Sequence, residues 1–228
     1  NGTKITLDSL RKGIVSIQGS TKIIQPENGL LTYDRTDSKS SEVLFNTLTT
    51  PRGGQYQVVL PDGTKVWLND ASSIYFPSEF TGKVRQVRIT GEVYFEVAAS
   101  AKIPFEVLVN DITVQVLGTH FYVMAYKDEP VSKVTLLQGA VKVVEGSRTV
   151  LLKPGQQAQM SDKGGLIHVE SVDPQGIIAW KNNQFWFNDD SIQTVMRQLS
   201  RWYDVEVIIK GDIPQHFDGN MVTNIGVS

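Results

Sequence analysis

The sequence predicts a mainly β fold, in which an antiparallel β-sandwich or β-solenoid-like domain precedes a small α/β domain of β-α-β order. Apolar and polar residues alternate in short runs from about residue 55 to residue 170, and turn-forming residues separate these runs. The runs recur at roughly 8–12 residues, a spacing typical of sandwiches, barrels and solenoids. After Trp180 the apolar residues change to helical spacing, and this change predicts the second domain.

Composition narrows the possible functions. The chain has 228 residues, of which 40% are hydrophobic and 20% charged, so a sizeable core can form. The net charge of −2 and the absence of basic runs argue against nucleic acid or acidic lipid as partners. The absence of cysteine excludes disulfides, thiolate zinc sites and cysteine nucleophiles. The sequence contains no apolar run of the roughly 18 residues that a membrane helix needs.

Residues 1–49 are polar and irregular, and we interpret them as a lead-in segment. The sequence starts at Asn1 rather than at methionine, so we expect a membrane anchor to precede this segment outside the sequence given. Ile14, Val15, Ile17, Ile23 and Ile24 are able to form short strands.

Residues 50–175 are predicted to form the large β domain. Its clearest element is a hairpin in which Pro61-Asp62-Gly63-Thr64 forms the turn, because proline presets φ, aspartate bonds its own backbone and glycine accepts positive φ. The short connections between the later runs predict mostly antiparallel neighbours. These later runs are Val87/Ile89, Val93/Phe95/Val97, Phe105/Val107/Val109, Ile112/Val114/Val116, Phe121/Val123/Ala125, Val134/Leu136, Val141/Val143 and Val150/Leu152.

Residues 176–228 are predicted to form the small domain, which we expect to be incomplete. Gln184–Phe187 is a predicted strand, and Asp190 with Gln193 three residues later resembles a capping box that starts a helix. Its apolar stripe ends at Trp202, and Val205–Ile209 follows as a predicted edge strand. One helix on so few strands buries little surface, and for this reason the domain is interpreted as truncated.

Catalytic and metal sites are not indicated. The three histidines lack metal-ligand spacing, and Arg52-Gly53-Gly54 has neither the lysine nor the following helix of a phosphate loop. Glu92 and Glu96 would lie about 13 Å apart along one strand, wider than a glycosidase pair. A hydrolase would require Glu92, Glu96 and His120 to converge in one pocket. We therefore expect neither an enzyme nor a bound cofactor or metal.

Aromatic residues gather in the small domain and suggest an interface. They either close a small core or leave Trp186 or Tyr203 exposed as an anchor for a partner, since such residues dominate binding hot spots. An open strand edge would also invite strand addition. The candidate partner-binding residues are Trp186, Arg201, Tyr203, Asp204, Val205, Val207 and Ile209.

A carbohydrate- or cell-wall-binding β module is the alternative. Trp67, Tyr75 and Phe76 would then form a platform for sugar stacking. Such a platform requires the aromatic faces to lie exposed on one concave surface with polar groups beside them.

Several short motifs follow one another between residues 50 and 160: Thr50-Pro51-Arg52-Gly53-Gly54, Leu60–Asn69, Arg85 with Val87, Gly91–Val97, Pro104-Phe105, Val116–Thr119, Gly139-Ala140-Val141 and Leu152–Gln156. Their order resembles the FecR family of sigma-regulating proteins. One departure is Tyr122, where the family pattern has asparagine after Phe121. The tail from Trp180 is similar to the C-terminal domain often attached to this family, which is itself similar to the short signalling domain of secretins and outer-membrane transducers.

The resemblance implies the periplasmic part of a single-pass inner-membrane anti-sigma factor. In such a protein, a TonB-dependent outer-membrane transporter signals through its N-terminal signalling domain, and an extracytoplasmic-function sigma factor is released. The cytoplasmic sigma-binding segment and the membrane helix that the resemblance implies lie outside this sequence, so these residues would not contact the sigma factor. We therefore expect a protein–protein signalling module.

Overall fold

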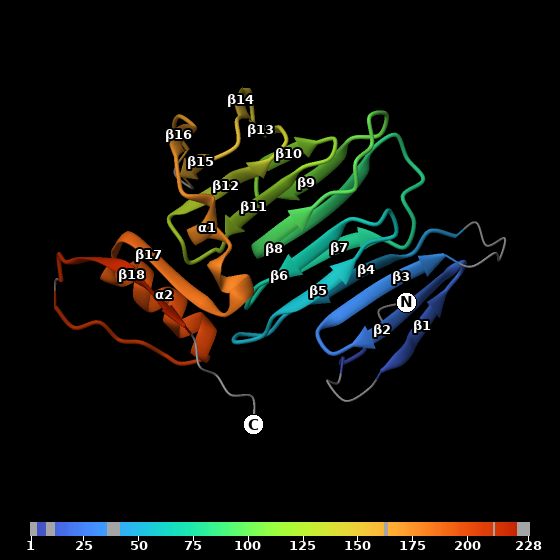
Figure 1. The fold of residues 1–228 in the computed structure, drawn as a ribbon, viewed down its shortest axis with the longest axis horizontal. Helices are drawn as coiled ribbons and strands as arrows, with labels where there is room; N and C mark the ends of the chain where they lie inside the picture. Colours follow the sequence, from blue (N-terminus) through green and yellow to red (C-terminus); the bar gives the residue numbers. More distant parts are fainter. Residues whose placement is uncertain (1–3, 8–11, 36–41, 162–163, 212, 223–228) are drawn as a thin grey trace.

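The computed structural model describes residues 4–7, 12–35, 42–161, 164–211 and 213–222. The described residues form a large β domain and a small C-terminal unit (Figure 1). The β domain contains β1 (Gly13–Gln18), β2 (Thr21–Glu27), β3 (Leu30–Arg35), β4 (Phe45–Thr49), β5 (Tyr56–Val59), β6 (Lys65–Leu68), β7 (Ser73–Pro77), β8 (Arg85–Glu96), β9 (Phe105–Val109), β10 (Ile112–Val116), β11 (His120–Ala125), β12 (Val131–Gln138), β13 (Val141–Glu145), β14 (Arg148–Leu152), β15 (Gln156–Ser161) and β16 (His168–Ser171). The C-terminal unit contains α1 (Pro174–Ile177), η1 (Ala179–Asn182), β17 (Gln184–Ser191), α2 (Ile192–Tyr203) and β18 (His216–Val222).

The strands of the β domain form two layers that are joined through β8. One layer has the order β1-β2-β3-β5-β6-β8-β11-β12-β15-β16, and we call it the front sheet. In the other layer, β4 pairs with β7, both β7 and β9 pair with β8, β9 pairs with β10, β10 pairs with β13, and β13 pairs with β14. Among the described strand pairs, only β3–β5 and β8–β9 are parallel, so the mainly antiparallel β fold is confirmed.

β8 belongs to both layers because it is long and bends near its middle. Its first half pairs with β7 and β9, and its second half pairs with β6 and β11. Gly91 lies at the change of partners with φ of 80°, and a Cβ atom there would collide with Ser72. The bend places the inward residues of both halves in one core. This core contains Val87, Ile89, Val93 and Phe95, each at most 2% exposed.

The N-terminal strands belong to the folded domain. β1, β2 and β3 extend the front sheet through the parallel pairing of β3 with β5, and Ile23, Leu31 and Tyr33 enter the core. The segment that the sequence analysis interprets as a lead-in therefore contributes strands within its described residues. Apolar and polar residues alternate only weakly there, and the pairing of β2 with β3 shifts register between Ile24 and Glu27, so these strands are hard to predict from sequence.

The C-terminal unit consists of a two-stranded antiparallel sheet, β17–β18, and the helix α2. The strand predicted at Gln184–Phe187 continues to Ser191, and Ser191 rather than Asp190 is the N-cap of α2, accepting from the Thr194 amide at 3.3 Å. Asp190 remains in the strand, where its carboxylate accepts from the Asn188 amide. None of the helices in the described part of the chain is long and apolar enough to cross a membrane.

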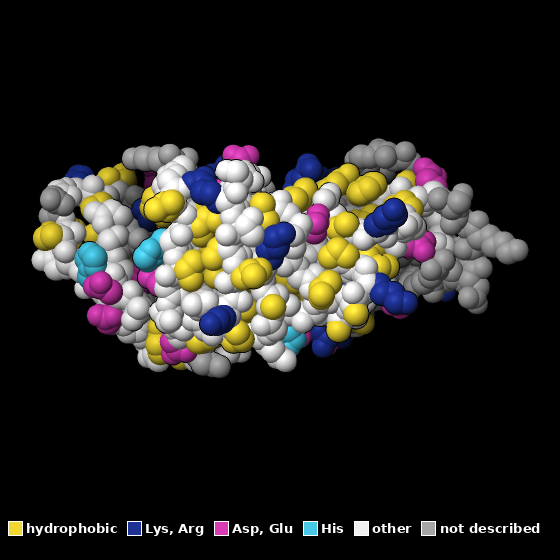
Figure 2. All heavy atoms as spheres, turned by 90° about the horizontal axis from the view of Figure 1, so that it is seen from above, with side chains coloured by type: hydrophobic (Ala, Val, Ile, Leu, Met, Phe, Trp, Pro, Cys, Tyr) yellow, Lys and Arg dark blue, Asp and Glu magenta, His cyan; other side chains and the backbone are white. Residues whose placement is uncertain are grey.

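The face seen from above carries no continuous charged patch. Lys, Arg, Asp and Glu side chains are scattered there among hydrophobic and polar ones (Figure 2). This distribution agrees with the small net charge of −2. It adds no support for an electrostatic partner such as nucleic acid on this face.

Candidate functional site at the junction of the two units

The C-terminal unit packs against the outer face of the front sheet. Residues of β8 and β11 that point away from the main core form a second apolar cluster with residues of the C-terminal unit, namely Tyr94, Tyr122, Trp180, Phe185 and Trp202. Lys181 of η1 lies between two rings of the sheet, with its Nζ 3.8 Å from the Trp67 ring centre and 3.9 Å from that of Tyr94. Two-residue periodicity thus gives the front sheet one face for the core and one for the junction.

The loop before β5 holds the carboxyl end of α2. Arg52 donates to the Ser200 carbonyl at 2.7 Å and pairs with the Asp204 carboxylate at 2.8 Å, and the Gly53 amide donates to the Arg201 carbonyl at 2.9 Å. The carboxyl end of a helix has unpaired carbonyl groups and a partial negative charge, so a guanidinium and an amide satisfy both needs. Gly53 has φ of 67°, and a Cβ atom there would lie 2.8 Å from the Trp202 carbonyl oxygen. The loop therefore needs glycine at this position.

An ion-pair network joins α2 to the loop between β11 and β12. Arg201 pairs with Asp128 at 2.9 Å and with Glu129 at 2.8 Å, while Arg197 pairs with the second oxygen of Glu129 at 2.6 Å. The Arg201 side chain is 6% exposed and its guanidinium lies 4.0 Å from the ring centre of Tyr126. Charge-assisted bonds of this kind are strong, and in a buried setting the loss of one partner is costly.

Two further carboxylates lie beside this network. The pKa of Asp70 is raised to about 7, mainly by burial and then by the neighbouring Glu92, while Arg201, whose Nε lies 3.9 Å from the Asp70 carboxylate, opposes the shift. Burial also raises the pKa of Glu92, which accepts from the Tyr122 hydroxyl at 2.8 Å and from the Asn69 amide at 3.0 Å. Burial thus disfavours the charged form of both carboxylates, and their hydrogen bonds and the nearby Arg201 oppose this effect.

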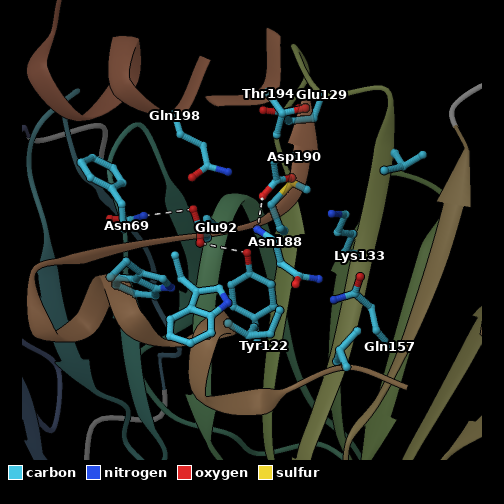
Figure 3. A pocket seen from close by; sticks show the side chains of 18 of the residues that line it. Asn69, Glu92, Tyr122, Glu129, Lys133, Gln157, Asn188, Asp190, Thr194 and Gln198 are labelled. Atoms are coloured by element: carbon cyan, nitrogen blue, oxygen red, sulfur yellow. Dashed lines mark hydrogen bonds between the residues drawn. The ribbon is translucent and has the colours of Figure 1, made fainter. Parts of the chain in front are cut away.

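A cavity of about 540 Å³ lies between the front sheet and the C-terminal unit. Figure 3 shows Glu92 pointing into it beside Asn69 and Tyr122, with Gln198 of α2 above and Lys133 and Gln157 to the other side of Tyr122. Trp180, Phe185, Trp186 and Trp202 also line it. Two of these rings, Trp180 and Trp202, have buried indole N–H groups without a hydrogen-bond partner in the described structure. Each unpaired buried donor costs about 1–3 kcal/mol, so the junction is far from optimally packed.

The structure places the predicted partner-binding residues in different settings. Trp186 is 40% exposed and Tyr203 44% exposed, and Asp204 is exposed while paired with Arg52. Arg201 is buried in the ion-pair network, so the assumption that it is a free surface group is wrong. Its four acidic neighbours, Asp70, Glu92, Asp128 and Glu129, come from segments distant in sequence, so the local sequence did not indicate that it is buried.

Val205–Ile209 does not form the predicted edge strand. The segment has no regular secondary structure between α2 and β18, and its backbone hydrogen bonds at Val205 go to the end of α2 and to Arg52. Val205, Val207 and Ile208 are nevertheless exposed, whereas Ile209 is half-buried. The pairing partner of β17 is instead β18, which starts at His216, so no neighbouring strand is left for this segment.

The aromatic platform of the carbohydrate alternative is not present. Phe76 is fully buried, and Trp67 lies at the junction under Lys181, whereas Tyr75 is on β7 in the other layer. The three residues proposed for a hydrolase do not converge either. Glu92 lines the cavity, but Glu96 pairs with Lys181 and, like His120, lies outside the cavity lining. In the described residues no group of three or more His, Cys, Asp or Glu side chains could hold a metal.

The fold and the junction define a β-rich protein in which a small α/β unit is docked on a two-layered domain. The sequence profile described as FecR protein matches residues 46–142, and the profile described as FecR, C-terminal matches residues 184–226. The chain belongs to the FecR family.

Two solved structures of a candidate anti-sigma factor from Parabacteroides distasonis ATCC 8503 are similar to this chain. They are 30% and 31% identical in sequence with TM-scores of 0.75 and 0.74, and each comparison covers 78% of this chain and 84% of the other. No curated protein sequence matches the chain.

Most residues of the junction were not predicted from sequence. Asp128 and Glu129 look like part of a surface turn, and Arg52-Gly53-Gly54 was excluded as a phosphate loop and otherwise stood only as part of a family motif. The one available signal was the family resemblance, since Arg52, Gly53, Asn69 and Glu92 all lie within its motifs. Tyr122, the departure from the family pattern, donates to Glu92 in the cavity.

Proposed function

We propose that this chain is the periplasmic sensor part of an anti-sigma factor. In this proposal it receives a signal from the N-terminal signalling domain of a TonB-dependent outer-membrane transporter and controls the release of an extracytoplasmic-function sigma factor. Membership of the FecR family and similarity to solved structures named as candidate anti-sigma factors support a regulatory role. The transporter, the sigma factor and the periplasmic location are inferred from the family resemblance.

One observation on the C-terminal unit carries the proposal. This unit and the segment after α2 expose several large apolar side chains although the unit is small: Trp186, Tyr203, Val205, Val207, Ile208, Phe217, Met221 and Val222. β18 is exposed along its whole length and pairs with β17 alone in the described residues. Exposed apolar groups and an open strand edge are typical of a protein-binding surface. The partner surface is therefore assigned to Trp186, Tyr203, Asp204 and the segment from Val205 to Ile209, without Arg201.

The test is calorimetric binding of this chain to the isolated signalling domain of a transporter encoded beside it. Tyr203→Ala is expected to weaken binding at least tenfold, because truncation of an interface tyrosine commonly costs about 1–2 kcal/mol or more. Tyr75→Ala is the matched control, since Tyr75 is 42% exposed on β7, away from the C-terminal unit. Equal affinity of Tyr203→Ala and wild type would remove this surface from the proposal. Absence of binding by the wild-type chain would argue against the transporter as partner.

A further inference from the structure

The cavity at the junction has the size and position of a small-molecule site. Its volume of about 540 Å³ lies within the range of roughly 300–1,000 Å³ that is usual for ligand pockets, which favour interfaces between structural units. Its walls come from β8, β11 and β12 on one side and from α1, β17 and α2 on the other. An occupant would therefore contact both units at once.

Glu92 reaches this cavity without a direct cationic partner. Within the described part of the chain, its carboxylate accepts hydrogen bonds only from neutral groups, the Tyr122 hydroxyl, the Asn69 amide and, at 3.3 Å, the Tyr126 hydroxyl. The guanidinium of Arg201 makes its closest contacts with Asp128 and Glu129 instead. A carboxylate deep in the protein with no counter-ion is costly, and an added cation would lower that cost.

Acidic groups outnumber basic groups around the cavity. The junction network contains the four carboxylates of Asp70, Glu92, Asp128 and Glu129 but only the two guanidinium groups of Arg197 and Arg201. The cavity wall adds Glu170, Asp173 and Asp190 against one lysine, Lys133, which makes no ion pair within the described residues. The excess of negative charge disfavours an anionic occupant and favours a positive one.

Aromatic rings line the same cavity. Tyr122, Trp180, Phe185 and Trp186 contribute to its wall. A cation over the face of such a ring is attracted by the negative face of the ring, more strongly when water is excluded. Recognition of organic ammonium groups commonly combines aromatic rings with a carboxylate, and both are present here.

We propose that this cavity binds a small organic molecule with an ammonium group, for which Glu92 is the counter-ion. The ligand stabilises the docked arrangement of the two units, because binding to the docked form alone adds stability in proportion to the logarithm of ligand concentration. The proposal does not depend on the transporter or the sigma factor, so the two proposals fail independently.

The test uses pairs of probes that differ only in charge. Calorimetry and thermal unfolding of the full chain would compare n-butylammonium with n-butanol, and glucosamine with glucose. Binding of at least one ammonium probe, with a higher Tm, and no binding of its neutral counterpart are expected. Equal binding of the neutral counterpart, or no binding of either ammonium probe at millimolar concentration, would overturn the proposal.

Charge variants then identify the counter-ion. Glu92→Gln keeps the side-chain shape and is expected to weaken ammonium binding at least tenfold. Glu96→Gln is the matched control, because Glu96 lies on the same strand four residues further on and outside the cavity lining. Lys133→Gln is expected to strengthen binding severalfold by removing a positive charge from the wall, and it keeps the question testable if Glu92→Gln fails to fold. Unchanged affinity in a folded Glu92→Gln variant, or weaker binding in Lys133→Gln, would contradict the assignment.

Discussion

Arg201 joins the two units through one side chain. From α2 it pairs with Asp128 and Glu129 and stacks on Tyr126, and its own carbonyl accepts from the Gly53 amide. The side chain is almost fully buried, so these contacts are little screened by solvent. The position at which an exposed helix-end arginine was expected therefore holds the docked arrangement together.

Replacement of Arg201 by methionine is expected to be among the most destabilising single changes at the junction. It leaves Asp128 without its buried partner and Glu129 with Arg197 alone, and breaking a buried pair in this way costs about 3–5 kcal/mol. The control is Arg148→Ala, which removes the partly exposed pair with Glu145 within one hairpin and should cost about 1 kcal/mol or less. Urea unfolding followed by tryptophan fluorescence measures both. Similar midpoints for the two variants would mean that the network contributes little.

The chemistry of the candidate site was only partly predictable from residue types. Trp186 and Tyr203 are exposed as the hot-spot argument expects, whether or not a partner binds them. Glu92 could not be recognised as a cavity residue, because its hydrogen-bond donors come from the β6–β7 loop, from β11 and from the end of that strand. Local sequence contains strand periodicity but not the pairing that brings these segments together.

At the scale of elements, alternating apolar and polar residues predict the strands of the β domain, and turn-forming residues predict the connections between them. The predicted hairpin around Pro61-Asp62-Gly63-Thr64 is the β5–β6 pair, in which Asp62 accepts from the Thr64 amide as an Asp turn residue should. The segment from Val205 to Ile209 has the same apolar alternation but no strand beside it. A strand needs a hydrogen-bonding neighbour, and sequence alone does not supply one.

The loop at Arg52 and Gly53 is expected to control how firmly α2 is docked. Gly53→Ala introduces strain at φ of 67° and a close contact with the Trp202 carbonyl oxygen, so docking should weaken. Gly63→Ala is the matched control, because Gly63 has φ of 84° but nothing within 4 Å of an added Cβ atom. Amide hydrogen exchange should become faster in α2 for Gly53→Ala and stay unchanged there for Gly63→Ala. Equal protection of α2 in both variants would show that the loop does not hold the helix.

At the scale of the whole molecule, the inner and outer faces of the front sheet differ in how well they are packed. Its inner face is a dry apolar core, with Val58, Val66 and Phe95 fully buried. Its outer face carries charged groups, a cavity and the unpaired indole N–H groups of Trp180 and Trp202. The β domain is therefore expected to be the more stable part, and the junction is the place where ligand, partner or pH most easily changes the arrangement.

The pH dependence of this junction follows from Asp70. The pKa of Asp70 is raised to about 7, mainly by burial and then by Glu92, while Arg201, Tyr126 and Arg52 oppose the shift. A raised pKa in the folded state means that the folded protein binds an extra proton between about pH 4 and pH 7. Its contribution to the free energy of unfolding is therefore fully present below about pH 4 and is lost as the pH rises through about 7.

Asp70→Asn is expected to remove most of this dependence. The variant should gain stability at pH 8, on the order of 1–3 kcal/mol, because the cost of a buried charge disappears while part of the attraction to Arg201 is also lost. At pH 5 the two proteins should differ less, since Asp70 is then largely protonated. Urea unfolding at both pH values measures the difference, with Asp111→Asn in the exposed β9–β10 turn as control. A gain that is equal at pH 5 and pH 8 would mean that Asp70 does not take up a proton in this range, and the junction would then respond to pH through Glu92 or not at all.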